Sequence, residues 1–155
     1  KKGVFVMQRF TNSKLHELGS NLLYPGALTF AHFNADEEND KYSVEFESKD
    51  GAQVKVNVKQ GTSFKSEIYN SIEEASYDFE TDSVGFSPST NHTFNGVELV
   101  TKSWKVKPLD LLSIESSLFD NKELFPEGTV EVDHCLFMED IEHSWRNVDS
   151  ICCGS

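Results

Sequence analysis

The sequence has few cysteines and no long apolar run. Its three cysteines are an odd number and too few for the disulfide framework of a small secreted domain. Cys152 and Cys153 are adjacent and could form only a strained ring, so we expect a reduced pair. No stretch reaches the roughly 18 apolar residues that a membrane helix needs, and residues 1–8 lose their apolar character too early for a signal peptide. These absences predict a cytoplasmic protein with no membrane contact.

Basic residues are also scarce. The chain has 14 Lys and Arg against 26 Asp and Glu, a formal net charge of -12. A surface of this sign repels nucleic acid and anionic lipid headgroups. We therefore expect neither nucleic acid nor a membrane as partner, whereas a homo-oligomer is compatible with the composition.

The common catalytic and cofactor motifs are missing. There is no Gly-x-Ser-x-Gly turn, phosphate-binding glycine loop or paired-cysteine zinc site. His134 and Cys135 are neighbours on an expected strand and would point to opposite faces, which excludes a thiol nucleophile with its base. We expect no metal and no cofactor.

What the chain does have is enough apolar and aromatic character to fold. Hydrophobic residues make up 37% of the 155 residues, and 12 of them are Phe. A chain of this length can bury roughly 70% of its unfolded surface, so it needs no metal or disulfide for stability. We predict a single domain over residues 1–151, followed by a tail at residues 152–155.

Hydrophobic periodicity predicts mainly strands. A helix capped by Asn12 or Ser13 and a second helix over residues 66–81 are expected between them. Because strands do not alternate regularly with helices, the fold class is α+β and mainly β, an antiparallel sheet curled around a cavity. Strands are expected at residues 3–10, 28–33, 42–47, 54–58, 97–106, 110–119 and 129–138, with loops at 83–91 and 121–128.

The clearest local signal is a hairpin formed by residues 42–58. Apolar side chains take every second place on both strands, so their pairing must set the two apolar faces on the same side. A three-residue loop of residues 49–51, with Gly51 left-handed, achieves this and pairs Phe46 with Val54. We expect Val44, Phe46, Val54 and Val56 to be buried together.

Several pieces of the chain together resemble a known family. These are residues 3–7 followed by a small helix, residues 22–27, residues 96–99 leading to Trp104, and residues 140–145. Their order and spacing are similar to the YqjF-like uncharacterised family of the acetoacetate decarboxylase-like superfamily. The similarity covers most of the chain but only the later part of the family's usual length, so an N-terminal portion is expected to be absent.

The resemblance implies a curled antiparallel β-cone, or barrel-like sheet, with a small-molecule cavity. The enzyme that names the superfamily forms a Schiff base through a lysine in a Gly-Phe-Pro-Lys-Lys stretch. The matching stretch here is Leu23-Tyr24-Pro25-Gly26-Ala27, which supplies no amine. We therefore expect no decarboxylation by this route and, more generally, a binding domain rather than an enzyme.

The leading functional hypothesis is a domain that binds an apolar or keto-acid-like small molecule. Its pocket is expected to be lined by Tyr24, Phe30, His32, Trp104 and His134. One alternative is a hydrolase or lyase acting on a small organic acid, with His32 or His134 as general base. A second alternative is a protein-interaction module, which would present an exposed apolar patch in place of a cavity.

Overall fold

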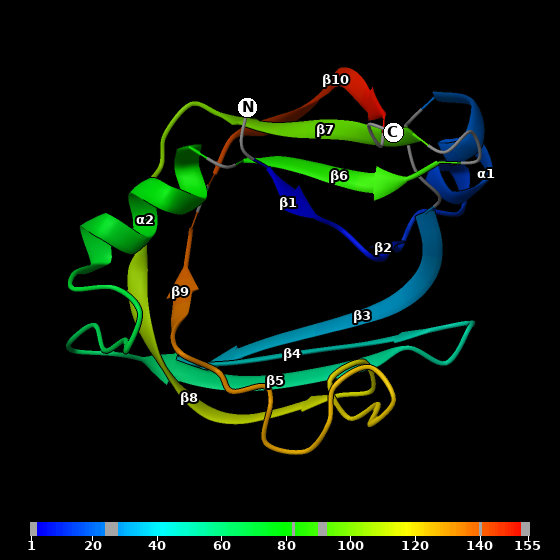
Figure 1. The fold of residues 1–155 in the computed structure, drawn as a ribbon. Helices are drawn as coiled ribbons and strands as arrows, with labels where there is room; N and C mark the ends of the chain where they lie inside the picture. Colours follow the sequence, from blue (N-terminus) through cyan, green and yellow to red (C-terminus); the bar gives the residue numbers. More distant parts are fainter. Residues whose placement is uncertain (1–2, 24–27, 82, 90–92, 140, 153–155) are drawn as a thin grey trace. The chain divides into compact units, whose positions relative to one another are not determined.

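The computed structural model describes residues 3–23, 28–81, 83–89, 93–139 and 141–152. Within these ranges the chain forms ten strands and two helices (Figure 1). The α+β, mainly β class with curled and mostly antiparallel strands is therefore confirmed. The chain divides into two compact units, unit 1 (Lys1–Phe30, Ser76–Trp104 and Asp140–Ser155) and unit 2 (Ala31–Ala75 and Lys105–Glu139). Whether they act as one domain stays a prediction.

Unit 1 is built on a four-stranded sheet. Its strands lie in the order β1 (Val4–Phe5), β6 (Val84–Pro88), β7 (Thr93–Thr101) and β10 (His143–Cys152) (Figure 1). The β1–β6 pair is parallel and the other two pairs are antiparallel. Helix α1 (Lys14–Leu23) also belongs to this unit, and Ser13 caps it because its Oγ accepts the N–H of His16 at 3.3 Å.

A second sheet has the strand order β2-β3-β4-β5-β8-β9. Its first pair, β2 with the start of β3, is parallel and lies in unit 1, whereas the rest is antiparallel and lies in unit 2. Strand β8 bends along its length (Figure 1). The strand bounds are Arg9–Thr11 (β2), Leu28–Glu38 (β3), Lys41–Ser48 (β4), Gln53–Gln60 (β5), Lys107–Ser116 (β8) and Cys135–Phe137 (β9).

The predicted hairpin is confirmed in loop length and register. Gly51 has φ +87°, and Ser48 donates its backbone N–H to the carbonyl of Ala52 at 2.8 Å. Residues 49–51 therefore form the loop, and Phe46 pairs with Val54. The left-handed conformation at Gly51 costs a glycine little, which explains why the sequence determines this loop well.

The expected common burial of the hairpin's apolar face is wrong in part. Val44 is 45% exposed, and Phe46, Val54 and Val56 are only half-buried. The alternation decides which side chains share a face, but it does not decide how much of that face is covered. The buried apolar residues of this part of the sheet are instead Ala31 on β3 and Val58 on β5.

The second helix is shorter than predicted. The spacing of apolar residues favours a helix over residues 66–81, but α2 spans Ile72–Thr81. The Oγ of Ser66 accepts the N–H of Tyr69 at 2.8 Å, a local bond that competes with helical pairing. Ser71 then caps α2 through a bond from the N–H of Glu74 to its Oγ, at 3.2 Å.

Several strand boundaries also differ from the sequence prediction. The segment 83–91 was expected to be a loop, yet it contains β6, and strand β10 was not expected at all. The strand predicted at residues 129–138 forms only as β9, and residues 3–10 contain two short strands instead of one. Glycine, serine and proline in β6 lower its strand propensity, so its two neighbours in the sheet must stabilise it.

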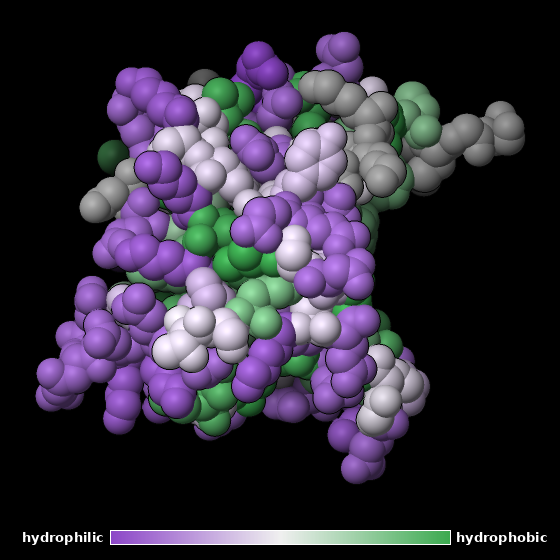
Figure 2. Space-filling model, turned by 90° about the vertical axis from the view of Figure 1, so that its left-hand side faces the viewer, coloured by the Kyte–Doolittle hydropathy of each residue, from purple (hydrophilic) through white to green (hydrophobic). Residues whose placement is uncertain are grey.

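Polar residues cover most of the face seen in Figure 2, with small hydrophobic patches between them. This agrees with the formal charge of -12. Neither helix of the described residues is long and apolar enough to cross a membrane.

Candidate functional site

The sequence-predicted site residues do not line one common pocket. Phe30 lies in unit 1, where the ammonium of Lys14 is 5.6 Å from its ring centroid. Trp104, also in unit 1, donates its indole N–H to Ser76 Oγ at 3.0 Å. Tyr24 falls outside the described residues.

The two predicted histidines lie in unit 2 and line different pockets. His32 is exposed and pairs with Glu47 across the β3–β4 ladder, on the polar face of the sheet. The side chain of His134 is only 11% exposed, and its Nδ1 is 2.6 Å from a carboxylate oxygen of Asp133. Of the two histidines, His134 is therefore the one with a largely enclosed side chain.

A mainly apolar site lies in unit 1. It is a pocket of about 460 Å³, within the range of small-molecule sites in proteins. Most of the wall is apolar or aromatic, and the polar groups are few. The described residues that line it are Val6, Arg9, Phe10, Thr11, His16, Leu28, Gly85, Val97 and Trp145.

One short segment supplies much of this wall. Residues 6–11 comprise the connection from β1 (residues 6–8) and strand β2, and β1 and β2 pair in parallel with different partners. The N–H of Val6 donates to the carbonyl of Phe86 at 2.8 Å, and Arg9 pairs with Leu28 on β3. The segment is thus fixed at both ends, which holds the Arg9 side chain in the wall.

Arg9 supplies the fixed positive charge among the lining residues. Its Nη2 donates to the carbonyl oxygen of Gly85 at 3.2 Å, and partial burial lowers the pKa of the guanidinium. The group stays protonated at any physiological pH, because the ordinary pKa of arginine lies far above that range. A charge that has lost part of its water gains more from an anionic ligand than an exposed charge does.

Gly85 keeps this part of the pocket open. A Cβ at this position would lie 2.8 Å from Val6 Cγ2 and 3.9 Å from Arg9 Nη2. Any side chain here would therefore push against the segment that carries Arg9 and fill the space beside its guanidinium.

Sequence reasoning missed both Arg9 and Gly85 as site residues. Two signals were present, since the chain has only two arginines and Arg9 lies two residues after the apolar segment that ends at Met7. Trp145 also lines this pocket. Its strand, β10, was not predicted, so its pairing with Leu99 on β7 could not be foreseen.

The described residues contain no group of three or more His, Cys, Asp or Glu side chains that could hold a metal ion. Comparison with family models, curated proteins and solved structures finds no match to this chain. The site therefore has to be interpreted from its own chemistry.

Proposed function

We propose that this chain binds a small organic anion with an apolar body in the pocket of unit 1. The ligand class is the apolar or keto-acid-like one expected from the sequence, but the residues are different. The observation that carries the proposal is the position of the Arg9 guanidinium in a mainly apolar wall. The apolar lining would hold the ligand's body, and Arg9 would pair with its carboxylate.

A carboxylate matches the planar guanidinium because two parallel N–H···O bonds can form between them. Thr11 and His16 are further polar residues of the wall that could orient the ligand. Binding an anion also requires a cation close to the site, because a chain with a net charge of -12 repels anions at longer range. We also propose a cytoplasmic location for the chain. The pocket of unit 1 would be the small-molecule cavity that the resemblance to acetoacetate decarboxylase-like proteins implies.

Removing the charge should weaken anion binding selectively. We expect Arg9→Gln to weaken decanoate binding about 10- to 100-fold, because a hydrogen bond to a charged group contributes about 1.5–3 kcal/mol. Decanol, which has a similar body without the charge, should bind the variant within about threefold of the original protein. Affinities can be measured by displacement of a fluorescent naphthalene sulfonate.

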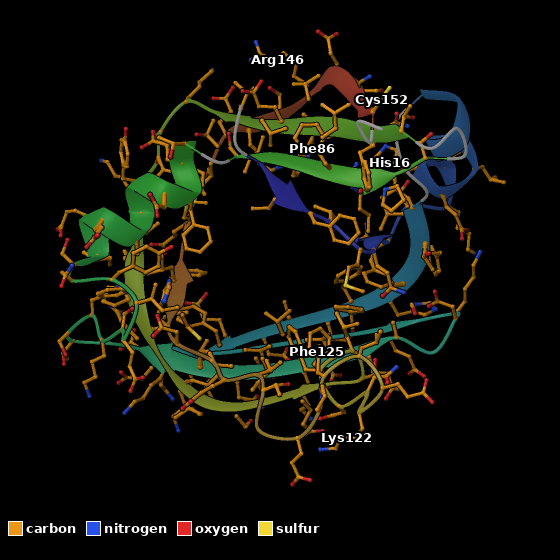
Figure 3. All side chains as sticks on the ribbon, in the orientation of Figure 1. His16, Phe86, Lys122, Phe125, Arg146 and Cys152 are labelled. Carbon is orange, nitrogen blue, oxygen red and sulfur yellow. The ribbon has the colours of Figure 1, made fainter. Side chains whose placement is uncertain are left out.

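Arg146 provides the matched control, because it is the only other arginine and lies in the same unit. It lies on β10 (Figure 3), on the opposite strand face from its neighbour Trp145, and its Nε donates to Glu98 at 2.9 Å. Arg146→Gln should leave both affinities unchanged. The proposed role of Arg9 would be refuted if the two arginine variants weakened decanoate binding equally. It would also be refuted if Arg9→Gln lowered the affinities for decanoate and decanol by the same factor.

We also predict that the protein does not decarboxylate acetoacetate and forms no borohydride-trappable adduct with a keto acid. None of the described residues that line the unit 1 pocket is a lysine, and a Schiff base requires a deprotonated amine. Mass spectrometry after borohydride treatment tests this directly. A lysine adduct would show that binding in this chain leads to covalent chemistry.

A further inference from the structure

Unit 2 contains a histidine–aspartate pair that the proposed binding function does not use. The Asp133 carboxylate accepts three bonds, from Ser66 Oγ at 2.5 Å, from the N–H of Glu67 at 2.6 Å and from His134 Nδ1 at 2.6 Å. The side chains of Asp133 and His134 are only 16% and 11% exposed. Two of the donors come from residues more than 60 positions away in the sequence, so the carboxylate is held in place independently of the histidine.

The hydrogen bonds determine which ring nitrogen of neutral His134 carries the proton. The three donors lower the pKa of Asp133 to about 2, with the bond from Ser66 as the main cause. An ionised carboxylate only accepts hydrogen bonds, so Nδ1 must be the protonated nitrogen. The lone pair of the neutral ring is then on Nε2.

Two aromatic rings fix the plane of the imidazole. Phe64 and Tyr69 contact it edge-on, with centroid distances of 5.3 and 5.4 Å. A ring that is held by a carboxylate and by two neighbours loses little freedom when it acts on a substrate. This is the arrangement that an efficient general base needs.

The pair also borders a pocket of about 380 Å³ within unit 2. Leucines at positions 109, 111 and 112 give the pocket an apolar part, and Lys65 adds a cation that can pair with a carbonyl oxygen or a carboxylate. Cys135 lines the same pocket, but burial raises the pKa of its thiol, which disfavours the thiolate. Water is therefore the better nucleophile at this site.

We propose that His134 is a general base for hydrolysis of a small carboxylic ester, with Asp133 as its positioning residue. Nε2 takes a proton from a water molecule while the water oxygen adds to the ester carbonyl carbon. The bond from this carbon to the leaving oxygen then breaks, and the imidazolium returns the proton to that oxygen. The products are the carboxylic acid and the alcohol, and no oxidant or reductant takes part.

The test uses the whole chain and p-nitrophenyl acetate, with release of p-nitrophenolate followed by absorbance. His134→Asn keeps a side-chain N–H that can donate to Asp133 but removes Nε2. We expect this variant to lose at least 90% of the rate, since general-base catalysis typically contributes about 100- to 10,000-fold. His143→Asn changes a histidine of unit 1, whose Nδ1 lies 3.0 Å from the carbonyl oxygen of Ile141, and should leave the rate unchanged.

Nitrogen NMR of the unmodified protein separates catalysis from a purely structural role. We expect the neutral ring of His134 to be protonated on Nδ1, and Asp133→Asn to shift the proton toward Nε2 and lower the ester rate. A wild-type rate no faster than that of an equal concentration of free imidazole would overturn the proposal. So would a His134→Asn rate within twofold of wild type, or a neutral ring protonated on Nε2. None of these outcomes bears on decanoate binding in unit 1.

Discussion

Replacing Phe86 by alanine is expected to lower the free energy of unfolding of unit 1 by about 3 kcal/mol. The ring of this β6 residue (Figure 3) lies against the backbone of two other chain segments. A Cβ on Gly3 would be 2.6 Å from its Cε2, and one on Gly96 would be 2.8 Å from its Cε1. Neither glycine has side-chain atoms with which to fill the space left by the ring, so the cavity should persist.

Phe5→Ala is the matched control within the same unit. Phe5 is 60% exposed and contacts Phe94 edge-on at a centroid distance of 6.1 Å, so its removal should cost less than about 1 kcal/mol. Both tryptophans belong to unit 1, and urea unfolding followed by tryptophan fluorescence therefore reports on this unit. Equal effects of the two substitutions would show that the Phe86 ring does not pack as described.

Asp133→Ala is expected to destabilise unit 2 more than any substitution of an exposed carboxylate there. The substitution removes the carboxylate that accepts three hydrogen bonds, so the donors of Ser66, Glu67 and His134 lose this acceptor. Asp110→Ala is the control, because Asp110 forms a partly exposed ion pair with Lys59 at 3.6 Å, and such pairs contribute little. The urea midpoint measured by circular dichroism should fall clearly for Asp133→Ala and only slightly for Asp110→Ala.

The contribution of Asp133 to the stability of the fold should also depend on pH. Because its pKa is lowered from 3.8 to about 2 in the folded protein, the ionised group stabilises the fold at every pH above its ordinary pKa. That stabilisation is lost as the pH falls from 3.8 toward 2. The difference in stability between wild type and Asp133→Ala should therefore shrink over this interval, and a constant difference would contradict the assigned bonds.

Local signals in the sequence predicted part of the fold correctly. The hairpin around Gly51 follows from alternation and turn chemistry, both of which act within about ten residues. The start of α1 follows in the same way from a capping serine at position 13. Where one short segment contains the determining interactions, its structure can be predicted from that segment alone.

Long-range contacts explain most of the errors. The N-terminal part of the predicted second helix is not helical, and Ser66 and Glu67 bond there to Asp133, a residue far away in the sequence. Strand β6 has weak intrinsic propensity and depends on β1 and β7 at its sides. No pattern within either segment reveals these partners.

The candidate site was predicted less well than the fold, for a related reason. The predicted site residues were aromatic and titratable residues on expected strands, but β3 contributes residues to both units, so Phe30 and His32 belong to different ones. Arg9 depends on pairing between β2 and β3 and on the carbonyl of Gly85, 76 positions away. The ligand class could be proposed from composition and resemblance, whereas the residues required the structure.

The most direct test of the proposed function is the NMR spectrum of the arginine Nε–H groups during titration with decanoate. The chain contains only Arg9 and Arg146, so two signals are expected, and Arg146→Lys identifies which is which. The proposed site predicts that decanoate shifts the Arg9 signal in a saturable way, that the Arg146 signal stays in place and that decanol produces a much smaller change. An Arg9 signal that does not move while decanoate binds elsewhere on the protein would contradict the proposed function.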